Sequence, residues 1–153
     1  MKFLKATAAL TSLLALAACS SMSGWSSEGG MGRATPEQVE ELETKVGDRV
    51  FFEYDSPMLT AEAQETLRKQ AAFMDENSSL SFTIEGHADE RGTREYNIAL
   101  GERRANAAVK FLTSLGVSSS RLHTVSYGKE KPAVAGSNDW SWSQNRRAVT
   151  VAE

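Results

Sequence analysis

The chain has 153 residues, which is enough for one compact domain and some extension. Its 41% hydrophobic and 24% charged residues are ordinary for a folded domain, and they exclude collagen-like, disordered and polytopic membrane proteins. A net charge of -3 lacks the basic balance that nucleic acid requires, and a single cysteine excludes an intramolecular disulfide and a multi-cysteine zinc site.

The chain begins with a segment that we predict to be an export signal, residues 1–18. Lys2 and Lys5 supply its positive start, and residues 6–18 are uncharged and rich in Ala and Leu. This stretch is shorter than the span of about 20 residues that crosses a bilayer, but it suits the apolar region of a signal.

The signal ends in Leu16-Ala-Ala-Cys19, which resembles the lipobox of bacterial lipoproteins. The resemblance implies cleavage before Cys19 and attachment of acyl chains to its sulfur and its new amino group. Because Ser20 follows, and not the Asp that marks inner-membrane retention, the resemblance also implies the outer membrane. An ordinary secretory signal with a chance cysteine is the alternative.

Residues 19–35 are predicted to be a flexible linker, because Ser and Gly dominate and few apolar side chains are present to bury a core. The remaining residues, 36–153, are predicted to form one domain. Helical and strand-like hydrophobic patterns alternate along it, separated by capping residues and glycines. Helices are expected at 36–46, at 61–77 behind a Thr60 cap, and at about 96–115, with strands at 49–54, 80–85, 122–127 and 147–151.

This order predicts an α/β (α+β) sandwich, with a four-stranded mixed sheet and two main helices packed on one face. Residues 128–145 are expected to be a loop that is longer than structural connections usually need. Trp140 and Trp142 lie two residues apart in that loop. They are either lid residues over the core or exposed anchors for a protein partner, a role in which Trp is enriched.

The densest polar run extends from Glu85 to Asn97, where a strand end, a glycine-containing loop and the start of a helix meet. Such a junction is where α/β sheets place ligands. Asp89 follows the strand, and Arg104 lies 15 residues later on the helix, so the return of the chain can bring both to one groove. A carboxylate and a guanidinium that face one groove suit a zwitterionic ligand.

The same run resembles the OmpA-like family of peptidoglycan-binding domains. The matching motifs are Gly86-His-Ala-Asp-Glu-Arg-Gly-Thr93, Tyr96-Asn97, Leu100 and Arg103-Arg104-Ala105, with Val50-Phe-Phe-Glu-Tyr-Asp55, 125–132 and 145–147 as flanking support. The resemblance covers residues 44–153. It implies a non-enzymatic domain, without cofactor or metal, that binds the meso-diaminopimelate side chain of a peptidoglycan stem peptide.

The resemblance also implies roles for individual residues. Asp89 would bind the ammonium group of the diaminopimelate, and Arg104 would bind its carboxylate. Tyr54 and Asp55 would line the pocket and offer backbone amides to that carboxylate, while Leu100 would form an apolar wall.

Three further positions qualify this assignment. Asn97 is expected to tie the loop to the helix. Tyr54 stands where the family usually has Phe, so its hydroxyl needs a partner if it is buried, and Ala88 stands where Thr is common. Neither departure removes a charge that the proposed recognition needs.

Together with the lipobox, the resemblance implies a lipoprotein of the Tol–Pal system, attached to the periplasmic face of the outer membrane and active in cell division. Its implied partners are peptidoglycan, TolB and the Tol complex. A wall-binding lipoprotein of the same family without Tol partners is one alternative. A peptidoglycan hydrolase that uses Glu85 and Asp89 as its carboxylate pair is an alternative from another class.

Several of these side chains also have plainer interpretations. Asp89 and Arg104 could simply pair with each other. His87 is expected to be a packed or hydrogen-bonded ring beside the pocket, with half of a metal site as the alternative, and His123 is interpreted in the same way. The other loop charges are expected to be solvated: Glu90, Arg91, Arg94 and Glu95.

Overall fold

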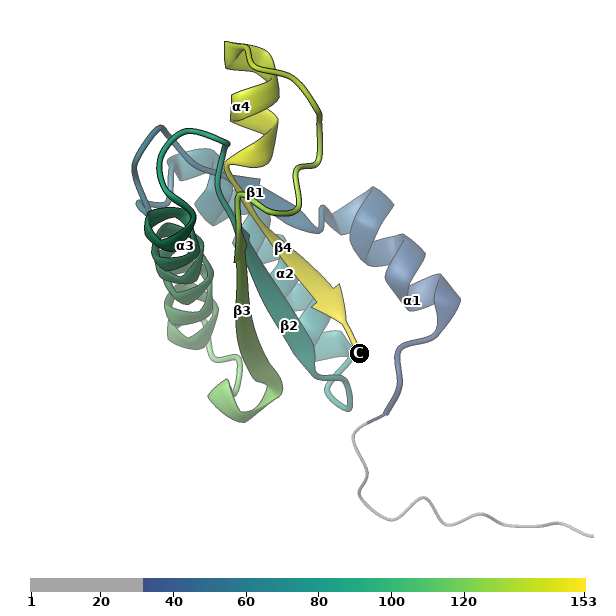
Figure 1. Ribbon diagram of the computed structural model, residues 1–153. Coiled ribbons are helices and arrows are strands. Elements are labelled where there is room, and N and C mark those ends of the chain that lie inside the picture. Colours follow the sequence, from purple (N-terminus) through teal and green to yellow (C-terminus); the bar gives the residue numbers. More distant parts are fainter. Residues whose placement is uncertain (1–31) are drawn as a thin grey trace, which may run out of the picture.

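The computed structural model describes residues 32–153, which fold around a four-stranded sheet in the order β1-β4-β2-β3 (Figure 1). The strands are β1 (Arg49–Phe51), β2 (Phe82–His87), β3 (Leu122–Gly128) and β4 (Arg147–Ala152). β2 pairs with β3 in parallel and with β4 antiparallel, and β1 pairs with β4 antiparallel. The predicted four-stranded mixed sheet is therefore confirmed.

Four helices accompany the sheet, and polar side chains determine where they begin. They are α1 (Pro36–Glu41), which continues as the π-helical turn η1 (Leu42–Val46), α2 (Ala61–Glu76), α3 (Arg94–Ser114) and α4 (Asp139–Asn145). A short 3-10 turn, Ser119–Arg121, precedes β3. Thr35 forms a capping box with Gln38, and Thr60 accepts from the Ala63 amide, as the sequence predicts.

The core lies between one face of the sheet and the two long helices, α2 and α3. Phe82 and Ile84 on β2 are fully buried, whereas the alternating Thr83 and Glu85 are partly exposed on the other face. Figure 1 shows α2 behind the sheet and α3 beside it. The buried apolar residues of both helices join those of the strands in one cluster, and the best-buried members are Leu67, Met74, Phe82, Ile84, Ala105 and Leu112.

Two glycines allow α3 to lie close to the end of β2. A Cβ atom on Gly86 would lie 1.8 Å from the carbonyl oxygen of Gly101, and a Cβ on Gly101 would lie 2.9 Å from the carbonyl oxygen of Gly86. Neither position therefore has room for a side chain. Since Arg104 lies one turn beyond Gly101, this contact brings it next to the segment that follows β2.

Two sequence expectations about the elements were wrong. The expected loop 128–145 contains α4, which begins after Asn138, whose side chain accepts from the Ser141 amide. The expected strand 49–54 ends at Phe51, because the chain turns at Tyr54 and Asp55, and Asp55 has a positive φ of 51°.

Both ends of the described chain lie at the edge of the sheet where β2 begins. The Gly32 amide donates to the Ser79 carbonyl, and the Ala34 amide donates to the carbonyl of Glu153. The last residues of the expected linker are therefore bonded to the domain. The predicted signal and Cys19 lie outside the described residues, and no helix within 32–153 has the length and apolar character of a membrane span.

Candidate functional site

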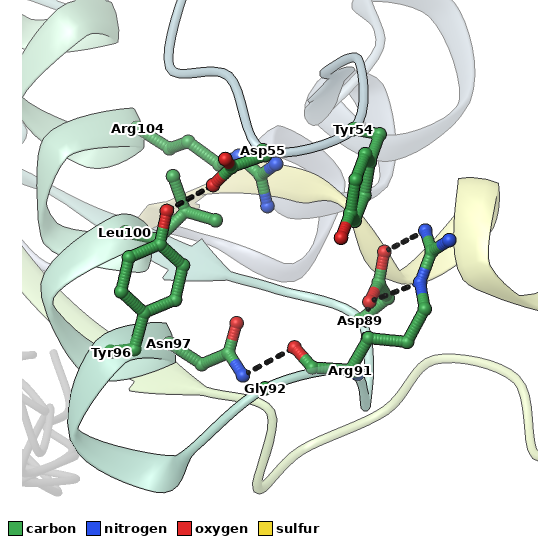
Figure 2. Close-up of a pocket in the computed structure, with 9 residues that line it drawn as sticks. All are labelled: Tyr54, Asp55, Asp89, Arg91, Gly92, Tyr96, Asn97, Leu100 and Arg104. Carbon is green, nitrogen blue, oxygen red and sulfur yellow. Dashed lines mark hydrogen bonds and ion pairs between the residues drawn. The ribbon is translucent and has the colours of Figure 1, made fainter.

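A cavity of about 260 Å³ opens at the opposite end of β2, where this strand gives way to the loop before α3 (Figure 2). The turn after β1 and the first three turns of α3 form its other walls. The cavity brings together all six residues that the sequence analysis assigned to the binding site. Nine residues line it: Tyr54, Asp55, Asp89, Arg91, Gly92, Tyr96, Asn97, Leu100 and Arg104.

Arg104 is 0% exposed, and its guanidinium donates to three backbone carbonyls. Nε bonds Ser56 at 3.0 Å, Nη1 bonds His87 at 2.9 Å and Nη2 bonds Glu53 at 3.0 Å. Burial lowers the pKa of Arg104 to about 10, so the side chain stays protonated at neutral pH. Arg104 therefore joins the turn after β1 to the end of β2, while it still lines the cavity.

Asp89 is 4% exposed and is held by two arginines. Oδ2 accepts from Nη2 of Arg91 at 2.8 Å and from Nη1 of Arg146 at 3.5 Å, and Oδ1 accepts from Nε of Arg91 at 3.1 Å. Burial opposes ionisation of Asp89, but the hydrogen bonds and charge of Arg91, with help from Arg146, hold its pKa below the usual value. The alternative of a direct pair with Arg104 is wrong, since the ion pairs that Asp89 makes within 32–153 are these two.

Arg91 lines the site, but the sequence analysis did not assign it there. Its Cζ lies 4.1 Å from the ring centroid of Tyr54 and 4.1 Å from that of Trp142, so the guanidinium makes cation–π contacts with two aromatic rings. The expectation that Arg91 is a solvated charge was therefore wrong. One signal was available, because an arginine two residues after an aspartate in a tight loop can fold back on it, but Trp142 is distant in the sequence.

The remaining lining residues stabilise the shape of the cavity. Tyr96, also missed, donates its hydroxyl to the Asp55 carboxylate, as Figure 2 shows. The Asn97 amide donates to the carbonyls of Arg91 at 2.9 Å and Thr93 at 3.0 Å, and so it does tie the loop to the helix. Tyr54 is 61% exposed, so its hydroxyl needs no buried partner.

His87 lies behind the cavity, on the outer face of the sheet. It is buried, neither ring nitrogen has a hydrogen-bond partner among the described residues, and Nε2 lies 3.6 Å from Oε2 of Glu85. Burial, followed by the positive charges of Arg147 and Lys131, lowers the pKa of His87 to about 4. Glu85 does not line the cavity, so the two carboxylates expected of a hydrolase do not share it.

The two tryptophans lie on α4 and have different surroundings. Trp142 covers Arg91, and its Nε1 donates to Oε1 of the neighbouring Glu90 at 2.9 Å. Trp142 is therefore a lid over the binding loop and not over the core. Trp140 is 63% exposed, which leaves its interpretation as an anchor for a partner open.

The arrangement can bind a small ligand that carries both charges. The cavity offers a buried, ionised carboxylate at Asp89, and the protonated guanidinium groups of Arg91 and Arg104 line the same cavity. Leu100 contributes an apolar surface between them. No Ser, Thr, Cys or Lys side chain lines this cavity.

Comparison with known proteins relates this site to a family. Residues 51–146 match the model of the OmpA family. The match covers more than half of the chain and includes every residue that lines the cavity.

Curated proteins of similar sequence carry the name peptidoglycan-associated lipoprotein. The protein from Agrobacterium fabrum is 49% identical over 152 residues, which cover 95% of this chain and 86% of its own. The protein from Brucella melitensis is 50% identical over 148 residues, covering 94% and 88%. The protein from Haemophilus influenzae is 41% identical over 149 residues, covering 97% of each chain.

Solved structures show the same fold. The crystal structure of the peptidoglycan-associated lipoprotein from Burkholderia pseudomallei matches with a TM-score of 0.67 at 40% identity, over 69% of this chain and 90% of that one. The C-terminal domain of Helicobacter pylori MotB, 19% identical with a TM-score of 0.65 over 69% of this chain and 84% of its own, shares the fold alone. The predicted OmpA-like fold and the resemblance to that family are confirmed.

Proposed function

Because the chain belongs to the OmpA family, and within it to the peptidoglycan-associated lipoproteins, we propose that it tethers the outer membrane to the cell wall. The domain binds peptidoglycan without covalent bonds, and acyl chains on Cys19 hold the other end in the outer membrane, on its periplasmic side. The observation that carries this proposal is the single cavity that the buried Asp89 and the buried Arg104 both line.

The ligand in this proposal is the meso-diaminopimelate side chain of a stem peptide, whose free end bears an ammonium and a carboxylate on one carbon. Asp89 binds the ammonium and Arg104 binds the carboxylate. Among the described residues, no acceptor receives the amides of Tyr54 or Asp55, which leaves both available to the carboxylate. Leu100 lies between the charged ends, beside the methylene groups of the ligand.

A comparison of two stem peptides tests this assignment. A stem with lysine in place of diaminopimelate keeps the ammonium but lacks the adjacent carboxylate, so the cationic groups of the site stay unmatched. We expect it to bind about tenfold more weakly, or worse, because a site built around a polar group rejects analogues that lack it. Calorimetry measures both affinities, and equal binding of the two stems would remove Arg104 from the proposed recognition.

Variants of the two charged residues test their separate roles. Asp89→Asn should weaken both stems alike, since both carry the ammonium. Arg104→Lys should weaken the diaminopimelate stem more than the lysine stem, because it keeps a charge but loses the planar fork that pairs with a carboxylate. Glu102→Gln, on the exposed side of α3, is the matched control and should bind as the unmutated protein does.

The anchor is proposed from the motif Leu16-Ala-Ala-Cys19. Cys19→Ala should prevent lipidation, and the protein should leave the outer-membrane fraction while its domain still binds purified sacculi. Fractionation of cells that express this variant measures the change. Retention of Cys19→Ala in the outer membrane would contradict the lipidation.

A non-enzymatic tether can function with modest individual contacts. Each charge-assisted hydrogen bond contributes only about 1.5–3 kcal/mol, but the anchor confines the domain near the wall and raises its effective concentration. A pull-down on purified sacculi, followed by a search for released muropeptides, separates this function from the alternative of a hydrolase. Binding without release supports the tether.

TolB and the Tol complex, through which the protein acts in cell division, are the proposed partners. This part rests on the family resemblance. If TolB uses the surface around the cavity, a soluble diaminopimelate stem peptide should compete with TolB for the domain. Cross-linking to TolB at increasing stem concentration measures the competition. Absence of any TolB cross-link would favour the alternative, a wall-binding lipoprotein without Tol partners.

A further inference from the structure

The Asp89 carboxylate has no acceptor position left for a ligand. An ionised carboxylate accepts at about four lone-pair positions. Oδ1 receives the backbone amide and Nε of Arg91, both at 3.1 Å. Oδ2 receives Nη2 of Arg91 at 2.8 Å and Nη1 of Arg146 at 3.5 Å. An ammonium group that binds Asp89 must therefore displace one of these four donors.

Of the two arginines, Arg91 is the one that a ligand can displace from Asp89. Its side chain is 32% exposed and lines the cavity, whereas the side chain of Arg146 is 14% exposed and does not line it. Arg146 is also held from the other side, because its Nε donates to the carbonyl of Phe52 at 2.9 Å. In Figure 2 the Arg91 fork lies against Asp89, beside the ring of Tyr54.

The guanidinium of Arg91 has a second place of contact that does not depend on Asp89. Its Cζ lies over the ring of Tyr54 and over the ring of Trp142, at 4.1 Å from each ring centroid. A guanidinium over two aromatic rings keeps favourable contacts when its in-plane hydrogen bonds are lost. Arg91 can therefore release the carboxylate without moving into open solvent.

We propose that Arg91 is an internal counter-ion, which occupies Asp89 in the empty cavity and is exchanged for the ammonium group of the ligand. This inference rests on the proposed function, in which Asp89 binds that ammonium. The exchange conserves charge at Asp89, because one cation replaces another. It also makes ligand entry a competition, so Arg91 lowers the affinity for ammonium ligands and discriminates against those too weak to displace it.

The ratio of two affinities tests the exchange in the full mature chain. One ligand is the diaminopimelate stem peptide, and the other is the same stem with hydrogen in place of the distal amino group. Arg91→Gln should raise the ratio of the first affinity to the second by about threefold to tenfold, because it removes a competitor that only the ammonium has to displace. The ratio cancels any effect of the variant on α4 or on the carboxylate end.

Arg94→Gln is the matched control. It removes the same charge from the same part of the chain, but Arg94 pairs with the exposed Glu130 at 3.3 Å and does not line the cavity. For Arg94→Gln, the ratio of the affinity for the stem peptide to the affinity for the analogue should equal that of the unmutated protein. If Arg91→Gln leaves this ratio unchanged or lowers it, the proposal that Arg91 is an internal counter-ion is wrong, even though the stem peptide binds. If the unmutated protein does not bind the stem, or does not prefer it to the analogue, the proposed recognition itself fails.

A second measurement follows Arg91 directly. In the empty protein the Nε–H of Arg91 is bonded to Asp89, and its exchange with water, followed by nuclear magnetic resonance, should be slow. Saturation with the stem peptide should accelerate this exchange at least severalfold, and the analogue without the amino group should not. Equal protection in the empty and the stem-bound protein would show that Arg91 stays on Asp89.

Discussion

At the scale of single residues, Arg104 holds the binding site together as well as lining it. Its guanidinium donates to carbonyls of Glu53 and Ser56 in the turn after β1 and of His87 at the end of β2. Its planar group also lies 5.2 Å from the ring centroid of Phe52. The loss of this side chain leaves buried carbonyls without a donor, so binding and stability change together.

We therefore expect Arg104→Ala to lower the free energy of unfolding by about 3–5 kcal/mol, the cost of removing one partner from a buried charged network. Urea unfolding followed by circular dichroism measures the change. Arg103→Ala is the control, since Arg103 is exposed and its Cζ lies over the ring of Tyr96 at 5.9 Å from the centroid. A loss no larger than that of the control would contradict the structural role of Arg104.

His87 makes the stability of the domain depend on pH. In the folded protein, burial lowers its pKa from 6.5 to about 4, the charges of Arg147, Lys131 and Arg49 add to the effect, and the backbone of Lys131 opposes it only weakly. The unfolded chain binds more protons between those two values. The free energy of unfolding therefore falls as the pH drops from about 6.5 to about 4. Above pH 6.5, His87 is neutral in both the folded and the unfolded chain, so the stability associated with it is fully retained.

The comparison with His87→Gln isolates this contribution from that of the carboxylates. Between pH 7 and pH 4 the unmutated protein should lose roughly 3 kcal/mol more than His87→Gln, which corresponds to the shift of its pKa. Urea unfolding at both pH values measures the difference, and the ring signals of His87 give its pKa directly. If the free energies of unfolding of the two proteins depend on pH in the same way, His87 is not a buried histidine that stays neutral.

At the scale of elements, α4 connects the long chain segment after β3 to the binding loop. Asn138 caps its first turn, and Asn145 at its end accepts from the amides of Ala133 and Val134. Between them, Trp142 stacks on Arg91 and bonds Glu90. A helix of seven residues has little stability of its own, so these tertiary contacts are what hold it.

We expect Trp142→Ala to destabilise α4 by about 1–3 kcal/mol, because it removes a cation–π contact and a hydrogen bond together. Hydrogen exchange of the α4 amides should accelerate by the corresponding factor, while that of β2 should not change. Trp140→Ala is the matched control two residues away, and its exposed ring predicts a change below about 0.5 kcal/mol. Equal acceleration in both variants would contradict the lid that Trp142 forms.

At the scale of the whole molecule, the described chain starts at the end of the sheet where β2 begins (Figure 1), and the cavity lies at the opposite end of β2. Gly32 and Ala34 are bonded beside Ser79 and Glu153, where β2 begins, and the cavity opens after its last residue. A domain attached to a membrane through its amino-terminal side therefore presents the cavity away from that attachment point. This polarity fits a protein that bridges two layers.

Attachment of the mature chain to a surface at different points tests this polarity. In a Cys19→Ala background, which has no other cysteine, a cysteine introduced at Arg33 should leave binding of soluble stem peptide within about twofold of its value in solution. A cysteine introduced at Ser137, which lies beside Glu90 near the cavity, should reduce binding at least fivefold, by about 1 kcal/mol or more. Surface plasmon resonance measures both. Equal binding from the two attachment points would contradict the polarity.

The amino-acid sequence by itself determined most of the elements and the family. Helix periodicity and the caps at Thr35 and Thr60 act within a few residues, so they predict α1 and α2 without knowledge of the fold. The run from Gly86 to Asn97 likewise contains Asp89 and Asn97, and six site residues follow from it and its flanks.

Only the tertiary structure decided how the charges of the site are paired. Arg104 meets carbonyls 48 and 51 positions away, and Arg91 meets Trp142 on a helix that local propensity did not predict. The same side chain is solvated or buried according to which distant segment packs on it, and no short-range pattern encodes that contact. The sequence therefore predicted which groups gather at the cavity, but the packing of the turn after β1 and of α4 determined that Arg91 occupies Asp89.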